Sequence, residues 1–355
     1  MNFVNRIKPS VRALEPYSVK GLTARIKLNQ NENPFDIPMA IKEKVLSRLS
    51  REQWNRYPET FPQDLIKAFA GYLQYPAEGI IVGNGSNELM YTILMAVVTK
   101  GTSVLLPSPA FFLYEKATRI FDGNVINVMM NDDLSYNANR FLEAAAHHDP
   151  SLIIIVSPNS PTAQSMPYDD IERILKETHA LVLVDEAYIE FSDKKSCFDL
   201  LKKYPNLIIL RTLSKSFSLA GLRVGYCLAH PEIRNEILKP KIPFTVNRFS
   251  AITAMTLLDH LDVVREHIEY IKHQKRLMEE SLRTIAGVTL YPSDTNFFLF
   301  RTARPSSELM DALLQKGVLV RDVSSYPMLE RCLRVNVGTE EENKQFIDIL
   351  RRLIH

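Results

Sequence analysis

The sequence predicts an α/β protein with a large, mostly parallel sheet flanked by helices and a smaller, C-terminal α+β part. From about residue 79 to 229, short apolar runs alternate with longer amphipathic segments, which is the pattern of β-α repeats. Most of these runs are nearly continuous in Val, Ile and Leu, as is typical of strands buried on both faces. The chain of 355 residues, 46% hydrophobic and 24% charged, is long enough to bury both cores.

The elements of the larger part follow in chain order. The stretch to about residue 38 is rich in proline and asparagine, and we expect it to lie across the other parts. Helices are predicted between the strands, for example over residues 87–100 and 168–178. Ligands are expected at the carboxyl ends of the strands. The predicted strands are GIIVGN, SVLLP, NVINVMM, LIIIVS, ALVLVD, NLIILR and RVGYCLA.

The pattern changes after residues 240–243 (PKIP), where two prolines exclude regular helix. An uninterrupted helix is predicted from about Asn247 to Thr284. Strands VTLYP and NFFLF, helix SSELMDALLQKG, strands VLVRDV and CLRVNVG, and helix EEENKQFIDILRRLIH follow. We therefore divide the chain into an N-terminal segment (1–38), a large domain (39–245) and a small domain (246–355).

Composition argues against several classes of function. The formal charge of +2 gives no field that would attract nucleic acid or an anionic membrane. No apolar run approaches the roughly 18 residues of a membrane helix, and the N-terminus lacks the apolar stretch of a signal peptide. The cysteines, at positions 197, 227 and 332, are too few and too far apart for a zinc site or a disulfide framework. We expect a cytoplasmic protein without a metal.

A glycine-rich turn follows the first predicted strand, at Gly83-Asn84-Gly85-Ser86-Asn87-Glu88. Its glycines allow a tight turn, Ser86 can cap the next helix, and free N–H groups at the helix start suit a phosphate. A Rossmann fingerprint would need a third glycine where Glu88 stands, and a P-loop would need a lysine. The turn is either a phosphate cup or an ordinary capped turn.

A carboxylate and a lysine follow two later strands. Asp185 ends the run ALVLVD, where burial is costly unless a protonated ring nitrogen, a metal or an arginine faces it; the alternative is a helix cap. Lys215, in TLSKSFS, is bracketed by hydroxyls and apolar strands. Partial desolvation would lower its pKa, so that the free amine could attack a carbonyl. The alternative is a solvated loop lysine.

Two more groups accompany them. Arg223, in LAGLRVGY, could close a phosphate site with Ser214, since a guanidinium offers two parallel N–H groups; otherwise it makes a surface ion pair. Asn159, in SPNSPT, could present an amide donor from a loop stiffened by prolines, or could simply lie in a turn. A phosphate cup, a carboxylate, an amine and an amide donor together match pyridoxal 5′-phosphate (PLP).

These residues resemble the PLP-dependent aminotransferases of the aspartate-aminotransferase fold. The likeness runs almost end to end, through LEPYSVKG, LNQNENPF, NRYPE, GNGSNE, SPNSPT, VDEAY, RTLSKSFSLAGLRVGY, DTNFFLF and LRVNVGT. It implies the PLP-dependent transferase fold with PLP as cofactor. Lys215 would bond to the cofactor and move the substrate proton, and Asp185 would face the pyridine nitrogen. Asn159 and Tyr188 would donate to the ring's phenolate oxygen. The other implied cofactor contacts are Gly85, Ser86, Asn87, Ser214 and Arg223 at the phosphate, and Phe111 on the ring.

The resemblance also implies a subunit partner and a substrate side. Tyr57, in NRYPE, matches a tyrosine that reaches the cofactor phosphate of the neighbouring subunit, which implies a homodimer against which segment 1–38 also packs. Arg334, in LRVNVG, matches the arginine that grips the substrate's carboxylate or phosphate. It would open a strand of the small domain and reach across the cleft, and the alternative is a surface charge. Other matching substrate-side positions are Arg321, Tyr17, Asn33 and Asn296.

The chain departs from the family pattern at two places. Asn-Ser-Pro-Thr-Ala at 159–163 replaces Asn-Asn-Pro-Thr-Gly, which keeps Asn159 and should only alter the loop geometry. Phe111 stands where a tyrosine is usual, so ring stacking survives and a hydroxyl near the lysine is lost. The implied reaction is amino transfer between L-histidinol phosphate and 2-oxoglutarate. The alternatives are a phosphothreonine decarboxylase, an aromatic-amino-acid aminotransferase and a PLP-sensing regulatory domain.

Overall fold

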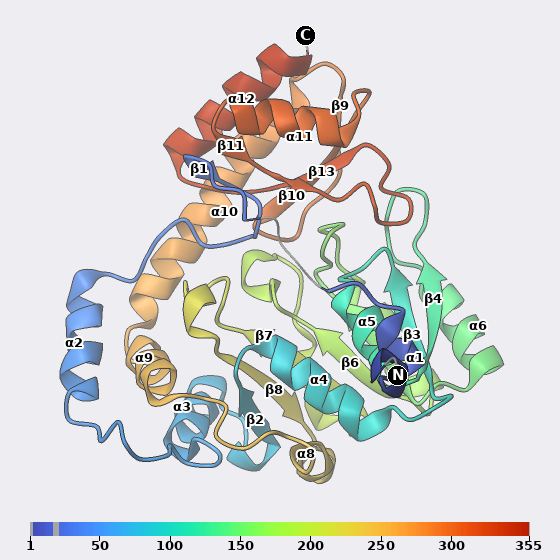
Figure 1. The fold of residues 1–355 in the computed structure, drawn as a ribbon, viewed down its shortest axis with the longest axis vertical. Coiled ribbons are helices and arrows are strands. Elements are labelled where there is room, and N and C mark those ends of the chain that lie inside the picture. Colours follow the sequence, from blue (N-terminus) through green and yellow to red (C-terminus); the bar gives the residue numbers. More distant parts are fainter. Residues whose placement is uncertain (1–2, 17–20, 355) are drawn as a thin grey trace.

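A seven-stranded sheet is the centre of the larger part of the chain (Figure 1). The structure, a computed structural model, describes residues 3–16 and 21–354. The strand order is β2-β8-β7-β6-β5-β3-β4, and only β8 runs against its neighbours, so the predicted mostly parallel sheet is confirmed. The strands are β2 (Ile80–Gly83), β3 (Ser103–Ser108), β4 (Asn124–Met129), β5 (Leu152–Val156), β6 (Leu181–Asp185), β7 (Leu207–Thr212) and β8 (Gly225–Ala229).

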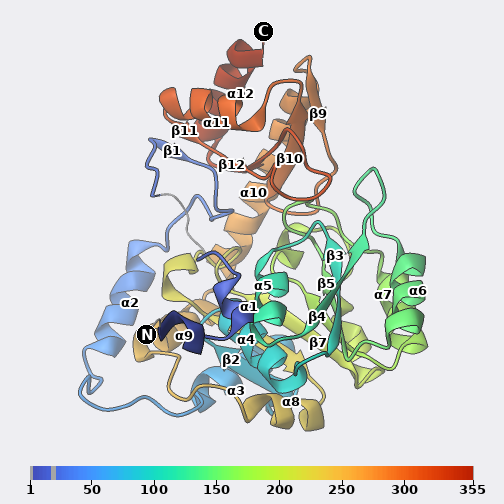
Figure 2. The ribbon, with the colours of Figure 1, turned by 45° about the vertical axis from the view of Figure 1, so that its right-hand side comes forward.

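Helices cover both faces of this sheet (Figure 2). Successive strand residues point to opposite sides, so Val104 and Leu183 pack in the core with α4, α5 and α8, whereas Leu105 and Val182 pack in the core with α3, α6, α7 and α9. Burial on both faces explains the continuous apolar runs. The helices are α2 (Met39–Leu49), α3 (Gln63–Leu73), α4 (Ser86–Val97), α5 (Leu113–Ile120), α6 (Ala138–His148), α7 (Tyr168–Glu177), α8 (Pro231–Leu238) and α9 (Arg248–Leu258).

A smaller sheet, in the order β12-β13-β10-β9, lies above the large one in the view of Figure 1. Phe298, Phe300 and Val335 are fully buried in its core with side chains from its helices. The N-terminal segment joins both parts, since β1 (Ile26–Lys27) pairs with β11 (Val318–Leu319) and α1 (Pro9–Arg12) contacts α5. The other elements are β9 (Val288–Leu290), β10 (Phe297–Thr302), β12 (Arg321–Asp322), β13 (Cys332–Asn336), α10 (Leu261–Arg283), α11 (Ser306–Gln315) and α12 (Glu340–Ile354).

The prediction of one uninterrupted helix from Asn247 to Thr284 is wrong. The helix breaks at Asp259 and His260, where His260 leaves the helical region with φ −130° and ψ 49°. The break lets α9 pack against α2 and α3 while α10 runs on to the small sheet. The α9 helix thus belongs to the core of the large sheet, and α10 links it to the small sheet. Within the described ranges, no helix combines the length and apolar character that crossing a membrane requires.

Candidate active site

The loops after β2, β3, β5, β6 and β7 leave the large sheet at the edge that faces the small sheet (Figure 1). A cavity of about 520 Å³ lies between them. Its lining brings together residues that are far apart in the sequence, as the βα pattern predicts. The predicted site residues among its lining are Ser86, Asn87, Phe111, Asp185, Tyr188, Ser214, Lys215, Arg223, Arg321 and Arg334.

One end of the cavity is built to hold an anion. Gly85, with φ 80°, precedes α4, and a Cβ there would lie 2.4 Å from a guanidinium nitrogen of Arg223. Only glycine therefore allows the turn and the arginine to lie so close. Arg223 Nη1 donates to Ser214 Oγ at 3.1 Å. With the N-terminus of α4 at Ser86, these groups offer backbone N–H, hydroxyl and guanidinium donors to one anion.

Asp185 lies at the end of β6 and is buried. Tyr114 donates to its Oδ2 at 2.6 Å, and the backbone N–H of Ala187 donates to its Oδ1 at 3.0 Å. Burial raises the pKa of Asp185 to about 6, and the hydrogen bond from Tyr114 opposes that rise. A cation beside this carboxylate would stabilise its charged form.

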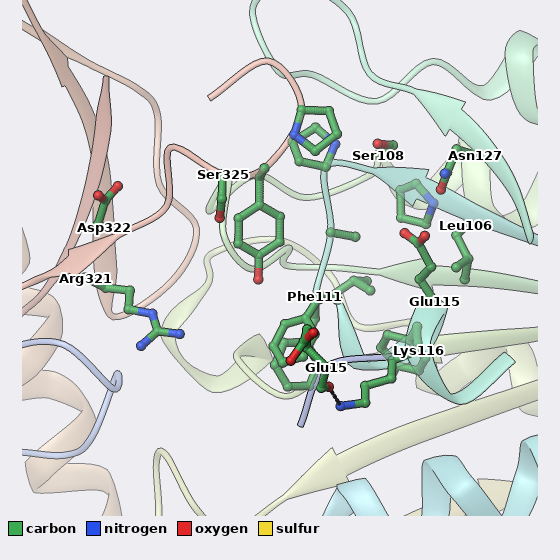
Figure 3. Close-up of a pocket in the computed structure, with 18 of the residues that line it drawn as sticks. Glu15, Leu106, Ser108, Phe111, Glu115, Lys116, Asn127, Arg321, Asp322 and Ser325 are labelled. Carbon is green, nitrogen blue, oxygen red and sulfur yellow. Dashed lines mark hydrogen bonds between the residues drawn. The ribbon is translucent and has the colours of Figure 1, made fainter. Parts of the chain in front are cut away.

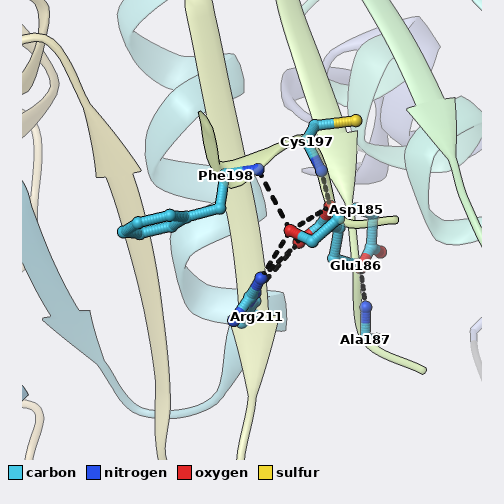
Figure 4. Close-up of polar contacts among 7 residues, drawn as sticks. Asp185, Glu186, Ala187, Cys197, Phe198 and Arg211 are labelled. Atoms are coloured by element: carbon cyan, nitrogen blue, oxygen red, sulfur yellow. Dashed lines mark hydrogen bonds and ion pairs between the residues drawn. The ribbon is translucent and has the colours of Figure 1, made fainter. Parts of the chain in front are cut away.

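Glu186, the residue after Asp185, binds polar groups outside the cavity (Figure 4). Glu186 is almost fully buried and forms an ion pair with Arg211, at 2.7 Å from Nη2. Ser196 Oγ and the backbone N–H of Cys197 also donate to its carboxylate. Because neighbouring residues of an extended chain point to opposite sides, this anchor directs Asp185 into the cavity.

Lys215 also lines the cavity. Its Nζ donates to the backbone oxygen of Gln30 at 2.8 Å. Burial lowers the pKa of Lys215 to about 7, and the positive charges of Arg334 and Arg223 add to this effect, whereas Glu32 opposes it. A lysine with this pKa is largely uncharged just above neutral pH, as a nucleophile or a base must be.

Tyr188 and Arg334 both line the cavity. Asn31 Nδ2 donates to the Tyr188 oxygen at 2.9 Å, which leaves the phenol proton for another acceptor. Arg334, in the middle of β13 rather than at its start, donates to Ser160 Oγ and to the backbone oxygen of Asn29, both at 3.0 Å. Burial raises the pKa of Tyr188, and Arg334, Asn31 and Ser160 oppose the rise.

Some predicted residues lie outside this cavity. Asn159 is fully buried, and its amide nitrogen donates to the backbone oxygen of Pro109 at 2.9 Å; its neighbour Ser160 lines the cavity instead. Asn33 lines an adjacent cavity, and Asn296 is buried with its amide on the backbone oxygen of Asn31. Gly85 does not line it either, and Tyr57 is 81% exposed. The predicted Tyr17 falls outside the residues that the structure describes.

A second cavity, of about 420 Å³, continues from the first (Figure 3). The two share Phe111, Tyr114 and Arg321 as walls. Arg321 reaches in from the small sheet, and Lys116 Nζ donates to the backbone oxygen of Glu15 at 2.5 Å, which ties the N-terminal segment to α5. Space for a substrate therefore extends past Phe111 toward Arg321.

Sequence reasoning missed Tyr114, Asn31 and Ser160. Tyr114 could have been found, because it follows Phe111 by three residues at the start of a helix and so faces the same way. Asn31 has φ 56°, a conformation that asparagine tolerates but that no sequence pattern specifies. Ser160 was noted only as a departure from the family pattern.

Tyr114→Phe should raise the pKa of Asp185 above about 6, because a hydrogen bond to a charged group is worth about 1.5–3 kcal/mol. PLP affinity of the apoenzyme should then fall by roughly tenfold near neutral pH and fall further as pH decreases. A titration of apoenzyme with PLP at several pH values measures this. Tyr91→Phe, outside the cavity, is the control; an unchanged pH profile in Tyr114→Phe would show that Tyr114 does not tune Asp185.

Comparisons with known proteins agree with this geometry. Residues 23–350 match the family described as aminotransferase class I and II. The histidinol-phosphate aminotransferase of Chlorobaculum tepidum is 45% identical over 348 residues, 98% of this chain and 100% of that protein. The one of Chlorobaculum parvum is 44% identical over 97% of both. The solved structure of histidinol-phosphate aminotransferase from Sinorhizobium meliloti in complex with pyridoxal-5′-phosphate, 23% identical, superposes over 98% of both chains with a TM-score of 0.88. The predicted fold is thereby confirmed.

Proposed function

The chain belongs to the class I and II aminotransferases, and from this membership we infer a PLP-dependent enzyme of L-histidine biosynthesis. It interconverts L-histidinol phosphate and 2-oxoglutarate with imidazole-acetol phosphate and L-glutamate. One observation carries this function: Lys215, Asp185, the anion site and Arg334 all line the same cavity. The near-complete coverage by histidinol-phosphate aminotransferases supports the choice of substrate.

The residues of the cavity fit PLP. Ser86, Ser214 and Arg223 converge where a phosphate would bind, and a side chain at Gly85 would push the Arg223 guanidinium out of this place. Asp185 is a buried carboxylate whose raised pKa calls for a cationic partner such as a protonated pyridine nitrogen. Phe111 lines the space between these ends and can stack on a ring.

The protein's own residues then perform the proton transfer. When bound, PLP withdraws electrons through its pyridine ring and so stabilises the carbon that loses its proton. Lys215 Nζ, uncharged above about pH 7, would accept that proton from the substrate carbon and pass it to the aldehyde carbon of the cofactor. Asp185 keeps a negative charge at the base of the cavity. Tyr188 and Asn159 are our candidates to donate to the ring oxygen, since the Asn159 amide has two N–H groups and Pro109 accepts only one; Ser160, which lines the cavity, is a further candidate.

A homodimer in the cytoplasm is part of this proposal. Trp54, Tyr57, Ile242 and Phe244 are exposed large apolar side chains, and the Tyr57 and Phe244 rings lie 5.1 Å apart, so the two segments form one patch. Such a patch favours a protein contact. Tyr57 does not line the cavity of its own chain, which leaves it available to a partner's. The three cysteines are free and buried, in keeping with a reducing compartment.

L-histidinol phosphate should have a higher kcat/KM than phenylalanine as amino donor to 2-oxoglutarate.

Arg334→Lys should lower kcat/KM for L-histidinol phosphate by about 10- to 100-fold and leave PLP affinity unchanged. The single ammonium group of lysine cannot bind an anion and at the same time replace the contacts of Arg334 to Ser160 and Asn29. Steady-state kinetics measure both, with Arg351→Lys on α12 as the control. A preference for phenylalanine would contradict the proposed donor.

A further inference from the structure

A buried ion pair lies behind the anion end of the cavity. Lys241 Nζ is 3.0 Å from Glu88 Oε1, and the two side chains are 1% and 14% exposed. Lys241 also donates to Thr245 Oγ1 at 2.8 Å and to the backbone oxygen of Ile242 at 3.3 Å, so its three N–H groups all have acceptors. Neither residue of the pair lines the cavity. Burying two charges is costly, which calls for a reason beyond stability.

Glu88 joins this pair to the turn that forms the anion site. It is the third residue of α4, and its Oε2 accepts the backbone N–H of Asn84 at 2.5 Å. Thr245 Oγ1 donates to its other oxygen at 3.0 Å. A glutamate that reaches back to the chain before its helix fixes the entry of that chain. The turn before α4 is therefore held in one conformation, which places Ser86 and Asn87, at the start of the helix, in the lining of the cavity.

The same carboxylate creates an electrostatic conflict. A negative side chain in the first turn of α4 competes with a bound anion for the positive end of the helix. Lys241 cancels this charge from the side of the turn away from the cavity. The turn is thus fixed by a carboxylate without presenting a net negative charge to a phosphate.

We propose that Glu88 and Lys241 are positioning residues for the phosphate of the cofactor, Glu88 by holding the turn and Lys241 by neutralising Glu88. This inference rests on the proposed function for the identity of the cofactor. If the proposal holds, loss of the pair weakens the binding only of ligands that carry a phosphate group. Pyridoxal, which has the ring and the aldehyde but no phosphate, binds independently of the pair.

The test is a titration of apoenzyme with PLP and, separately, with pyridoxal. Lys241→Met leaves the Glu88 carboxylate unpaired and should weaken PLP binding by about 100-fold, with pyridoxal affinity within about twofold. The double variant Glu88→Gln, Lys241→Met removes both charges and should recover most of the loss, to within about tenfold of wild type. Lys239→Met, two residues away and 68% exposed, is the matched control.

Equal losses of affinity for PLP and for pyridoxal in Lys241→Met would show that the pair only maintains the fold, and would overturn the proposal. Unchanged PLP affinity in Lys241→Met would overturn it as well. If Lys241→Met does not fold, the double variant decides: a loss of affinity of up to about tenfold that is confined to PLP supports the proposal, whereas a larger loss, an equal loss for both ligands or no loss contradicts it. These titrations contain no amino donor, so their outcome is independent of whether L-histidinol phosphate is the substrate.

Discussion

Lys215→Ala is expected to abolish amino transfer, with kcat lowered by at least about 10⁴-fold, because one side chain supplies both the nucleophilic amine and the base. The variant should still bind PLP through the anion site, although more weakly. After borohydride reduction, the wild-type protein should gain the mass of the cofactor and the variant should not. Mass spectrometry of both proteins, together with steady-state rates, measures this.

The pH dependence of the same attachment gives a second readout. Burial lowers the pKa of Lys215 to about 7, so the amine is protonated below that pH and uncharged above it. Covalent attachment of PLP to the wild-type protein should therefore increase between about pH 6 and about pH 8 and then level off. Lys203→Ala, at an exposed surface ion pair, is the control. Turnover retained in Lys215→Ala would exclude Lys215 as the reactive lysine.

Asp185→Asn is expected to lower kcat by about 10³-fold or more, because an amide of the same shape cannot stabilise a protonated pyridine nitrogen. Tyr114 and Ala187 can still reach the new side chain, so the local structure should persist. The absorbance spectrum of the bound cofactor should shift with the loss of the ring proton. Rapid-reaction kinetics of one half-reaction, recorded with the spectrum, measure both effects.

Asp64→Asn, on the exposed face of α3, controls for the loss of one negative charge. A decrease in kcat of less than about tenfold in Asp185→Asn would be too small for a residue that keeps the pyridine nitrogen protonated. Such a result would assign Asp185 the structural role that its hydrogen bond with Tyr114 also allows.

Much of this architecture could be predicted from the sequence because strands buried on both faces have continuous apolar runs. The predicted runs LIIIVS, ALVLVD and NLIILR correspond to β5, β6 and β7, and polar residues that follow them meet at one edge of the sheet. Lys215 and Asp185 were predictable for the same reason. The apolar runs indicate where each strand ends, and the carboxyl ends of parallel strands lie at the same edge of the sheet.

The remaining details depend on tertiary contacts that no pattern in the sequence records. Asn159 was the predicted donor, yet the loop turns its side chain toward Pro109 and presents Ser160 to the cavity. These residues lie in a turn after β5, where no periodicity specifies which of two neighbouring side chains points into the cavity. The helix break at His260 was missed because no proline or glycine marks it in the sequence. Only packing of α9 on α2 and α3 determines where the turn occurs.

The central claim is that this cavity transfers the amino group of L-histidinol phosphate to PLP. An absorbance titration of the PLP-loaded protein with L-histidinol phosphate, without any keto acid, tests it most directly. We predict that the band of the lysine-bound cofactor is replaced by that of pyridoxamine 5′-phosphate, and that 2-oxoglutarate then restores the first band. A cofactor band that L-histidinol phosphate leaves unchanged, while phosphothreonine or phenylalanine converts it, would contradict the claim.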